Sequence, residues 1–182
     1  MEHTEKFLLR DCEVIRIPAG DKITLPKGTR VVVTQALGGS YTVATDEGLV
    51  RIADGNADAL GIDEPVKQAA PAPAGPAGKV GEQSVWEQLR TCYDPEIPVN
   101  IVDLGLVYDC TVEQSDALPA KVNVKMTLTA PGCGMGPTIA AEARAKIEGI
   151  AGVGEASVEL VWDPPWNQAM ISEAGKMKLG LI

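Results

Sequence analysis

Cys133 stands in a glycine-rich segment, APGCGMG at 130–136, that favours an accessible thiol. The glycines around it carry no side chains to cover the sulfur, and they let backbone N–H groups approach a ligand closely. Pro137 follows, a residue that suits the first turn of a helix. A cysteine near a helix N-terminus feels a partial positive charge that favours the thiolate, which attacks electrophiles and binds metal ions.

Three polar residues are candidates for the same site: Thr129, Asp94 and Glu96. Thr129 is expected on the polar face of a strand just before Cys133, where its hydroxyl can donate a hydrogen bond to the sulfur or to a ligand. Asp94 and Glu96 offer carboxylate oxygens that could bind iron transiently or oppose thiolate formation by like charge, and the residues leave both open. The simpler interpretation is that Asp94 ends a helix ahead of Pro95 and Glu96 is a solvated charge.

The other three cysteines fit structural roles. Cys92 falls on an apolar helical stripe, Cys110 on an apolar strand face, and Cys12 at the start of a strand, so each is expected to be a small buried side chain. No Cys-x-x-Cys pair occurs and the only histidine is His3, which argues against a zinc finger and a Cys–His catalytic pair. A functional thiol is therefore expected at Cys133 alone.

Hydrophobic periodicity predicts the element order α-β-β-α-β-α for residues 83–182. The first helix is expected to end at Asp94-Pro95. Strands are expected at 106–112, 122–128 and 156–160, with a helix from Pro137 to about residue 150 and a short terminal helix from Ser172. The fold class is α/β (α+β, two-layer), a small mixed three-stranded sheet packed against helices.

The connections between these strands locate the site. The short link between the first two strands predicts an antiparallel pair, and the helical crossover after the second predicts a parallel one. Residues 94–105 should then reach the same sheet edge as Cys133, and open α/β sheets bind ligands at that edge.

Residues 1–63 are predicted to form a small all-β module, a barrel or meander. Short β-branched runs at 14–18, 29–34, 41–44 and 49–52 alternate with turn signals, and Asp46-Glu47-Gly48 suits a hairpin. A Pro/Ala/Gly-rich linker is predicted at 64–82. The module has no catalytic constellation, and its role is not predicted.

Composition narrows the range of partners. The chain has 182 residues, 45% of them hydrophobic, and a net charge of −9. A packed core is therefore expected, while the acidic surface disfavours nucleic acid and anionic lipid as partners. Neither a membrane span nor a signal peptide is expected, which predicts a cytoplasmic protein with reduced thiols.

Three segments resemble the signature blocks of the PaaD-like metal–sulfur cluster biosynthesis family. They are DPEIPVNIVDLGLVYD at 94–109, MTLTAPGC at 126–133 and VWDPPWN at 161–167. The N-terminal blocks IPAG, LPKGT, TQALGGSYTV and DALG are similar to the extension of SufT-type members. The resemblance implies a role in iron–sulfur protein maturation, with Cys133, Thr129, Asp94 and Glu96 at the functional positions.

The function expected on this basis is that of a SUF-type assembly factor that is not an enzyme. Cys133 would transiently hold iron, a cluster or a partner thiol, with Asp94 and Glu96 as weaker candidate ligands and no tightly bound cofactor. Its partners would be the assembly machinery and apo-client proteins, and a homodimer is one way to complete a ligand set. The alternatives are a non-catalytic adaptor and a cysteine-dependent transferase or hydrolase, which the lack of a usable histidine weakens.

Overall fold

The computed structural model describes residues 4–62, 79–116 and 118–182. Contacts between residues divide the chain into two compact units, Met1–Gln68 and Ala69–Ile182. Most of the predicted linker lies outside the described residues; near its end, Val80 is buried and Glu82 begins the first α-helix. Within the described parts, no helix is long and apolar enough to cross a membrane.

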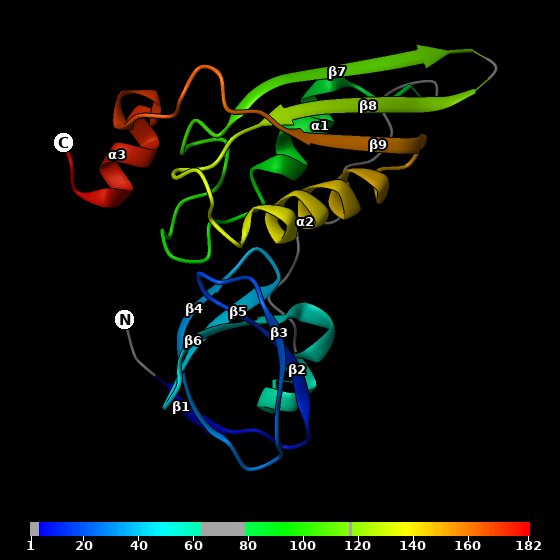
Figure 1. The fold of residues 1–182 in the computed structure, drawn as a ribbon. Helices are drawn as coiled ribbons and strands as arrows, with labels where there is room; N and C mark the ends of the chain where they lie inside the picture. Colours follow the sequence, from blue (N-terminus) through cyan, green and yellow to red (C-terminus); the bar gives the residue numbers. More distant parts are fainter. Residues whose placement is uncertain (1–3, 63–78, 117) are drawn as a thin grey trace. The chain divides into compact units, whose positions relative to one another are not determined.

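The N-terminal unit is a six-stranded antiparallel sheet that curves around its own core (Figure 1). The strand order is β1-β4-β5-β6-β2-β3. The core is formed by inward-facing aliphatic side chains and Tyr41, with Val31, Val43 and Ile52 fully buried. The strands are β1 (Thr4–Phe7), β2 (Cys12–Arg16), β3 (Lys22–Leu25), β4 (Arg30–Leu37), β5 (Ser40–Thr45) and β6 (Gly48–Ala53), followed by the 3-10 helix η1 (Asp54–Leu60).

This unit confirms the predicted all-β class and adds two strands to the four expected. β1 and β3 have four residues each and lie at the two ends of the strand order. The predicted hairpin joins β5 to β6, with Thr45 paired to Gly48. Thr45 closes the turn, because its hydroxyl donates to the Gly48 carbonyl at 2.9 Å and accepts from the Glu47 N–H at 3.2 Å.

The C-terminal unit has the predicted order α-β-β-α-β-α. β7 pairs antiparallel with β8, and β8 pairs parallel with β9, so the predicted mixed sheet is confirmed. The elements are α1 (Glu82–Leu89), β7 (Val107–Ser115), β8 (Leu118–Met126), α2 (Gly136–Glu148), β9 (Val153–Leu160), the 3-10 helix η3 (Gln168–Met170) and α3 (Glu173–Leu179).

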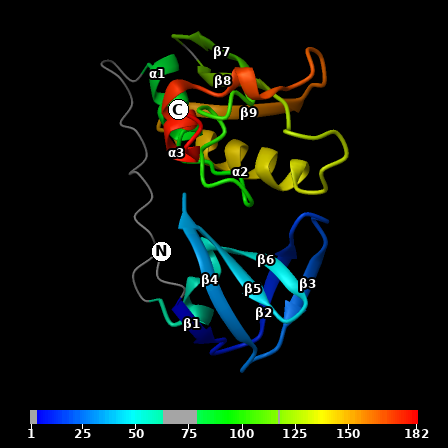
Figure 2. The ribbon, with the colours of Figure 1, turned by 90° about the vertical axis from the view of Figure 1, so that its left-hand side faces the viewer.

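One face of this sheet is covered by helices. α2 packs along β9, and α1 contacts both α2 and β7 (Figure 2). Val122, Val124 and Met126 on β8 point to this face and are buried. Lys121 and Lys125 alternate with them on the exposed face, which is the period of two that the sequence displays.

The first helix is shorter than predicted, since α1 ends at Leu89, ahead of Asp94-Pro95. The N–H of Arg90 bonds back to Trp86, and those of Thr91 and Cys92 to Gln88 and Leu89, in a tightening turn. Asp94 therefore does not end this helix. The interpretation of Asp94 as a helix terminator is wrong.

Candidate functional site

The Cys133 loop leaves the sheet at the carboxyl end of β8 and enters α2, as predicted. Beyond the strand, the Thr127 N–H donates to the Leu106 carbonyl at 2.7 Å, which keeps the start of β7 beside the end of β8. Within the loop, the Cys133 N–H donates to the Ala130 carbonyl at 3.4 Å, and the Cys133 carbonyl accepts from the Gly136 N–H at 3.2 Å. Cys133 is thus held in consecutive turns between strand and helix.

Packing beneath the loop fixes the start of α2. A side-chain carbon on Gly136 would lie 2.5 Å from a methyl of Leu128 and 3.3 Å from one of Leu160, so only glycine fits without displacement. Met135 is fully buried beside it. The first turn of α2 has no acidic residue to neutralise its partial positive charge.

Cys133 differs from the other three cysteines in exposure. All four are free thiols, but only Cys133 is partly exposed, while Cys12 and Cys92 are 0% exposed and Cys110 is 6% exposed. Burial raises the pKa of Cys110 to about 11, and the negative charges of Glu82 and Asp109 add to the rise. The buried structural roles predicted for these three cysteines fit their positions.

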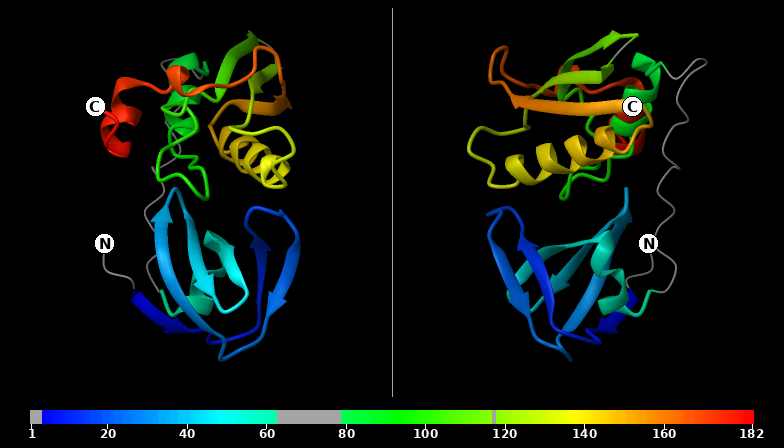
Figure 3. Two further views of the ribbon diagram at one scale, coloured as in Figure 1. Left: turned by 60° about the vertical axis from the view of Figure 1, so that its left-hand side comes forward. Right: turned by 90° about the vertical axis from the view of Figure 1, so that its right-hand side faces the viewer.

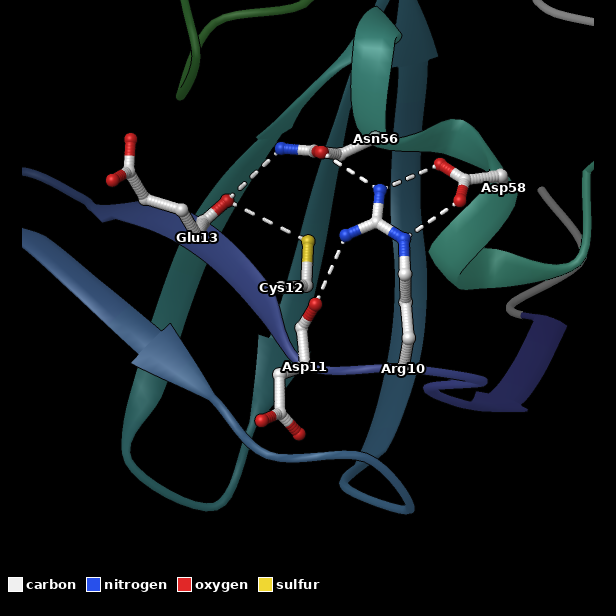
Figure 4. Close-up of polar contacts among 6 residues, drawn as sticks. All are labelled: Arg10, Asp11, Cys12, Glu13, Asn56 and Asp58. Atoms are coloured by element: carbon white, nitrogen blue, oxygen red, sulfur yellow. Dashed lines mark hydrogen bonds and ion pairs between the residues drawn. The ribbon is translucent and has the colours of Figure 1, made fainter.

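Cys12 lies in a cluster of polar side chains in the N-terminal unit (Figure 4). Arg10 binds both carboxylate oxygens of Asp58 at 2.7 and 2.8 Å, and it also donates to Asn56 and to the Asp11 carbonyl. The Cys12 thiol donates to the Glu13 carbonyl at 3.5 Å. Burial raises the pKa of Cys12, and the nearby Arg10 charge reverses only part of that rise.

Thr129 is not on a strand, contrary to the prediction. β8 ends at Met126, where its pairing with β7 and β9 ends, and Thr127 and Leu128 are both buried. The alternation of faces therefore stops before Thr129, which lies partly exposed in the loop four residues before Cys133. Thr129 still belongs to the Cys133 loop, but its orientation does not follow from the strand pattern.

Residues 94–105 lie at the predicted end of the sheet, with the start of β7, the end of β8 and the N-terminus of α2 (Figure 1). Asp94 shapes this segment, because its Oδ1 accepts from the N–H groups of Glu96 and Ile97, both at 2.8 Å. Glu96 is exposed. At least one oxygen of Asp94 thus has a structural role that the sequence analysis did not identify.

The C-terminal segment anchors the same loop. The Asp103 carboxylate accepts from Asn100 at 2.7 Å and from the Ser172 hydroxyl at 3.1 Å, and the Asp103 carbonyl accepts from the Ser172 N–H at 2.8 Å. Trp166 donates its indole N–H to the Leu104 carbonyl at 2.8 Å. The contacts of Ser172 and Trp166 span more than 60 residues, so no local sequence signal could have identified them.

Trp162 and Trp166 have different roles although they lie four residues apart. Trp166 is partly buried and bonds to the Leu104 carbonyl, whereas Trp162 is 46% exposed. The Val161 N–H donates to the Met126 carbonyl at 2.8 Å, which places Trp162 just beyond the paired ends of β8 and β9. The exposed indole of Trp162 therefore follows the end of β9. The neighbouring strand, β8, leads into the Cys133 loop at the same end of the sheet.

The chemistry available at this site is that of one accessible thiol on a braced loop. Among residues 4–62, 79–116 and 118–182, no group of three or more His, Cys, Asp or Glu side chains is placed to hold a metal ion. Cys133 can supply a single sulfur ligand or a single nucleophile. A metal ion or cluster bound by Cys133 would need its further ligands from outside this loop.

Comparison with known proteins identifies the family. Residues 82–159, within the C-terminal unit, match the family described as iron–sulfur cluster assembly protein. A Porphyromonas gingivalis protein named Fe-S protein maturation auxiliary factor is 42% identical over 101 residues, which are 56% of this chain and 92% of that protein. The chain belongs to this iron–sulfur cluster assembly family.

One further relative and one solved structure are also similar to this chain. The Fe-S protein maturation auxiliary factor SufT of Staphylococcus aureus is 39% identical over 88 residues, covering 48% of this chain and 96% of that protein. The crystal structure of a domain of unknown function, DUF59, from Bacillus anthracis is similar with a TM-score of 0.50 and 33% identity, covering 56% of this chain and 92% of that one. SufT-type membership, stated as a resemblance above, is thus confirmed.

Proposed function

We propose that this protein is a non-catalytic maturation factor of the SUF type, in which the Cys133 thiolate transiently holds iron, an iron–sulfur cluster or a partner thiol while an apo-client is loaded. The observation that carries the proposal is the exposure of Cys133 at the strand-to-helix turn, when the other three cysteines are buried. The names of the relatives support the maturation role. A reducing compartment such as the cytoplasm would keep the thiol available.

One thiolate supplies one of about four ligands that a cysteine-bound cluster needs. In the proposed reaction, Cys133 loses its proton as its sulfur takes one coordination position on the cargo. The remaining positions are filled by the assembly machinery, by small thiols or by a second copy of the chain. Thiolates of the apo-client then replace Cys133, which takes up a proton again. Glu96 and Thr129 lie in the two loops at this end of the sheet and are the secondary candidates for contact with the cargo.

The Cys133→Ser variant tests this proposal, because serine is similar in size but a poor substitute for a thiolate. We expect cells that carry it to lose most of the activity of iron–sulfur enzymes that depend on the protein. Cys110→Ser is the matched control, since that thiol is buried and should affect maturation only through stability. Circular dichroism of both variants would verify the fold.

An adaptor that brings machinery and clients together is the second candidate function, and the exposed Trp162 favours it as a docking residue. Full client activity with Cys133→Ser would establish the adaptor and exclude the thiol mechanism. Anaerobic reconstitution with iron and sulfide, followed by visible absorption, separates the two further. A carrier gains cluster absorption that Cys133→Ser lacks, whereas an adaptor gains none.

A further inference from the structure

β9 forms an open edge of the three-stranded sheet. Among the residues that the structure describes, β9 pairs only with β8 in the order β7-β8-β9, so about half of its backbone N–H and C=O groups face away from the sheet. The right-hand view of Figure 3 shows β9 along this edge with α2 beneath it. Such an edge can accept a further strand through main-chain hydrogen bonds.

A hollow of about 330 Å³ lies between this edge and α2. Small side chains leave the space open: Ala140 and Ala141 from α2, and Ala156 from β9. Val158 adds an apolar wall. Because alternate residues of a strand point to opposite faces, a strand added beside β9 would direct every second side chain into this hollow.

The exposed face of the sheet carries two rows of charge across its three strands. The register aligns Glu113, Lys121 and Glu155 in one row and Asp109, Lys125 and Glu159 in the other. Lys121 reaches Glu155 at 3.5 Å. Each lysine thus stands between two carboxylates, and both rows end at β9 on an acidic residue; Arg144 of α2 is close enough to Glu155 for their charges to interact.

Arg144 also lines the hollow, but its charge is already paired. Its Nε lies 2.9 Å from a carboxylate oxygen of Glu148 on the next turn of α2. The positive charge at the hollow is therefore balanced locally. Each row has two carboxylates and one lysine, so the sheet face that ends at β9 retains a net negative charge.

We propose that β9 binds an extended peptide segment of a partner protein as a fourth strand, with Lys or Arg beside Glu155 and Glu159 and small or β-branched apolar side chains in the hollow. Basic residues there would continue the alternation of charge in both rows, and opposite charges on neighbouring strands stabilise their pairing. That the partner is a client or an assembly protein rests on the proposed function; the strand addition itself does not involve Cys133.

A second copy of the chain fits this edge less well. A two-fold antiparallel pair of β9 strands centred on Ser157 would place Glu155 opposite Glu159 twice. Like charges in direct opposition destabilise a strand pair. The charge pattern therefore disfavours self-pairing in this register and favours a basic segment.

The test is a titration of the full isotope-labelled chain with a short capped peptide that alternates lysine and valine, followed by NMR amide shifts and hydrogen exchange. We expect slower exchange at outward-facing amides of β9 and at least about tenfold weaker binding of the matching glutamate–valine peptide. Glu155→Lys with Glu159→Lys should weaken binding of the lysine peptide at least about tenfold. Ala141→Leu, which fills the hollow without changing charge, should also weaken it.

Asp109→Lys with Glu113→Lys is the matched control, because it makes the same charge change in the same two rows at the β7 edge. It should change the affinity less than about twofold. An equal loss of affinity for the lysine peptide in both double variants would show that overall charge explains the effect, and it would overturn the proposal. So would protection at β7 instead of β9, a concentration-dependent dimer paired through β9, or no binding of the lysine peptide at millimolar concentration.

Discussion

Cys12 in the N-terminal unit and Cys133 in the C-terminal unit are the same side chain in opposite settings. Cys12 begins strand β2, is fully buried and has the guanidinium of Arg10 nearby, which by itself favours the thiolate. Cys133 has no such partner in its described hydrogen bonds, yet it is partly exposed where a strand leads into a helix. The pKa of Cys12 is nevertheless raised, so burial outweighs a neighbouring positive charge.

The comparison indicates that position in the fold, more than local charge, decides which cysteine can react. In the N-terminal unit, polar groups such as Arg10 and Asp58 hold the β1–β2 connection against η1 (Figure 4). In the C-terminal unit, bonds of Asp94 and Asp103 shape a loop at the sheet end near the exposed thiol. The same kinds of contact enclose one cysteine and brace the surroundings of the other.

The largest effect is expected in a direct comparison of thiol reactivity. With iodoacetamide at neutral pH, Cys133 should be alkylated on the order of 100-fold faster than Cys12 and Cys110, because it is exposed and their thiolate forms are suppressed by burial. Peptide mass spectrometry over a time course measures the four rates. In denaturant the four rates should converge, and similar native rates would contradict the distinction drawn here.

The next prediction concerns Cys110, which extends the comparison within the C-terminal unit. Its pKa of about 11 in the folded protein lies above the ordinary value of a cysteine thiol, so the stability it contributes is present below about pH 8.5–9 and is lost as pH rises through 11. The loss should reach about 2–3 kcal/mol by that pH. Denaturant unfolding followed by tryptophan fluorescence measures it, since Trp86, Trp162 and Trp166 all belong to this unit.

Cys110→Ala is the control for this pH dependence. Alanine cannot ionise, so the variant should be less stable at pH 7 but should lose less stability between pH 9 and 11. If the free energy of unfolding falls in parallel with pH in the two proteins, another group titrates, and burial of Cys110 is not what suppresses its thiolate.

The C-terminal fold was predictable because its signals are long and regular. β7, β8 and β9 alternate apolar and polar residues over most of their length, and the connection lengths allow one arrangement of neighbours. From this the location of Cys133 at the sheet end followed. β1 and β3 escaped prediction because each has only four residues and pairs at one end of the sheet; β1 is mostly exposed and polar, and β3 has only two apolar residues, Ile23 and Leu25.

The details of the candidate site were less predictable because they depend on where pairing stops. Thr129 was placed on a strand because its alternation continues past Met126 in sequence, yet the backbone leaves the ladder there. The interpretation of Asp94 as a helix end was wrong because a residue before proline suits a helix end as well as the turn it forms with Glu96. Contacts of Asp103 with Ser172 are long-range and leave no local pattern.

The smallest predicted effect tests whether the Arg10 cluster keeps Cys12 enclosed. Arg10 lowers the pKa of Asp58 through their hydrogen bonds and charge, so the pair stabilises the fold above the unfolded pKa of about 4 and stops doing so as pH falls below it. Asp58→Asn should therefore increase the alkylation rate of Cys12 by a few-fold at most at pH 7, because the pair is exposed and screened by salt. Below pH 4 alkylation is too slow to follow, so amide hydrogen exchange at β2 replaces it. The difference in exchange rate between Asp58→Asn and the unmodified chain should shrink there. A Cys12 rate that rises to that of Cys133 would mean that this surface ion pair, and not the packing of β2 in its sheet, separates the two thiols.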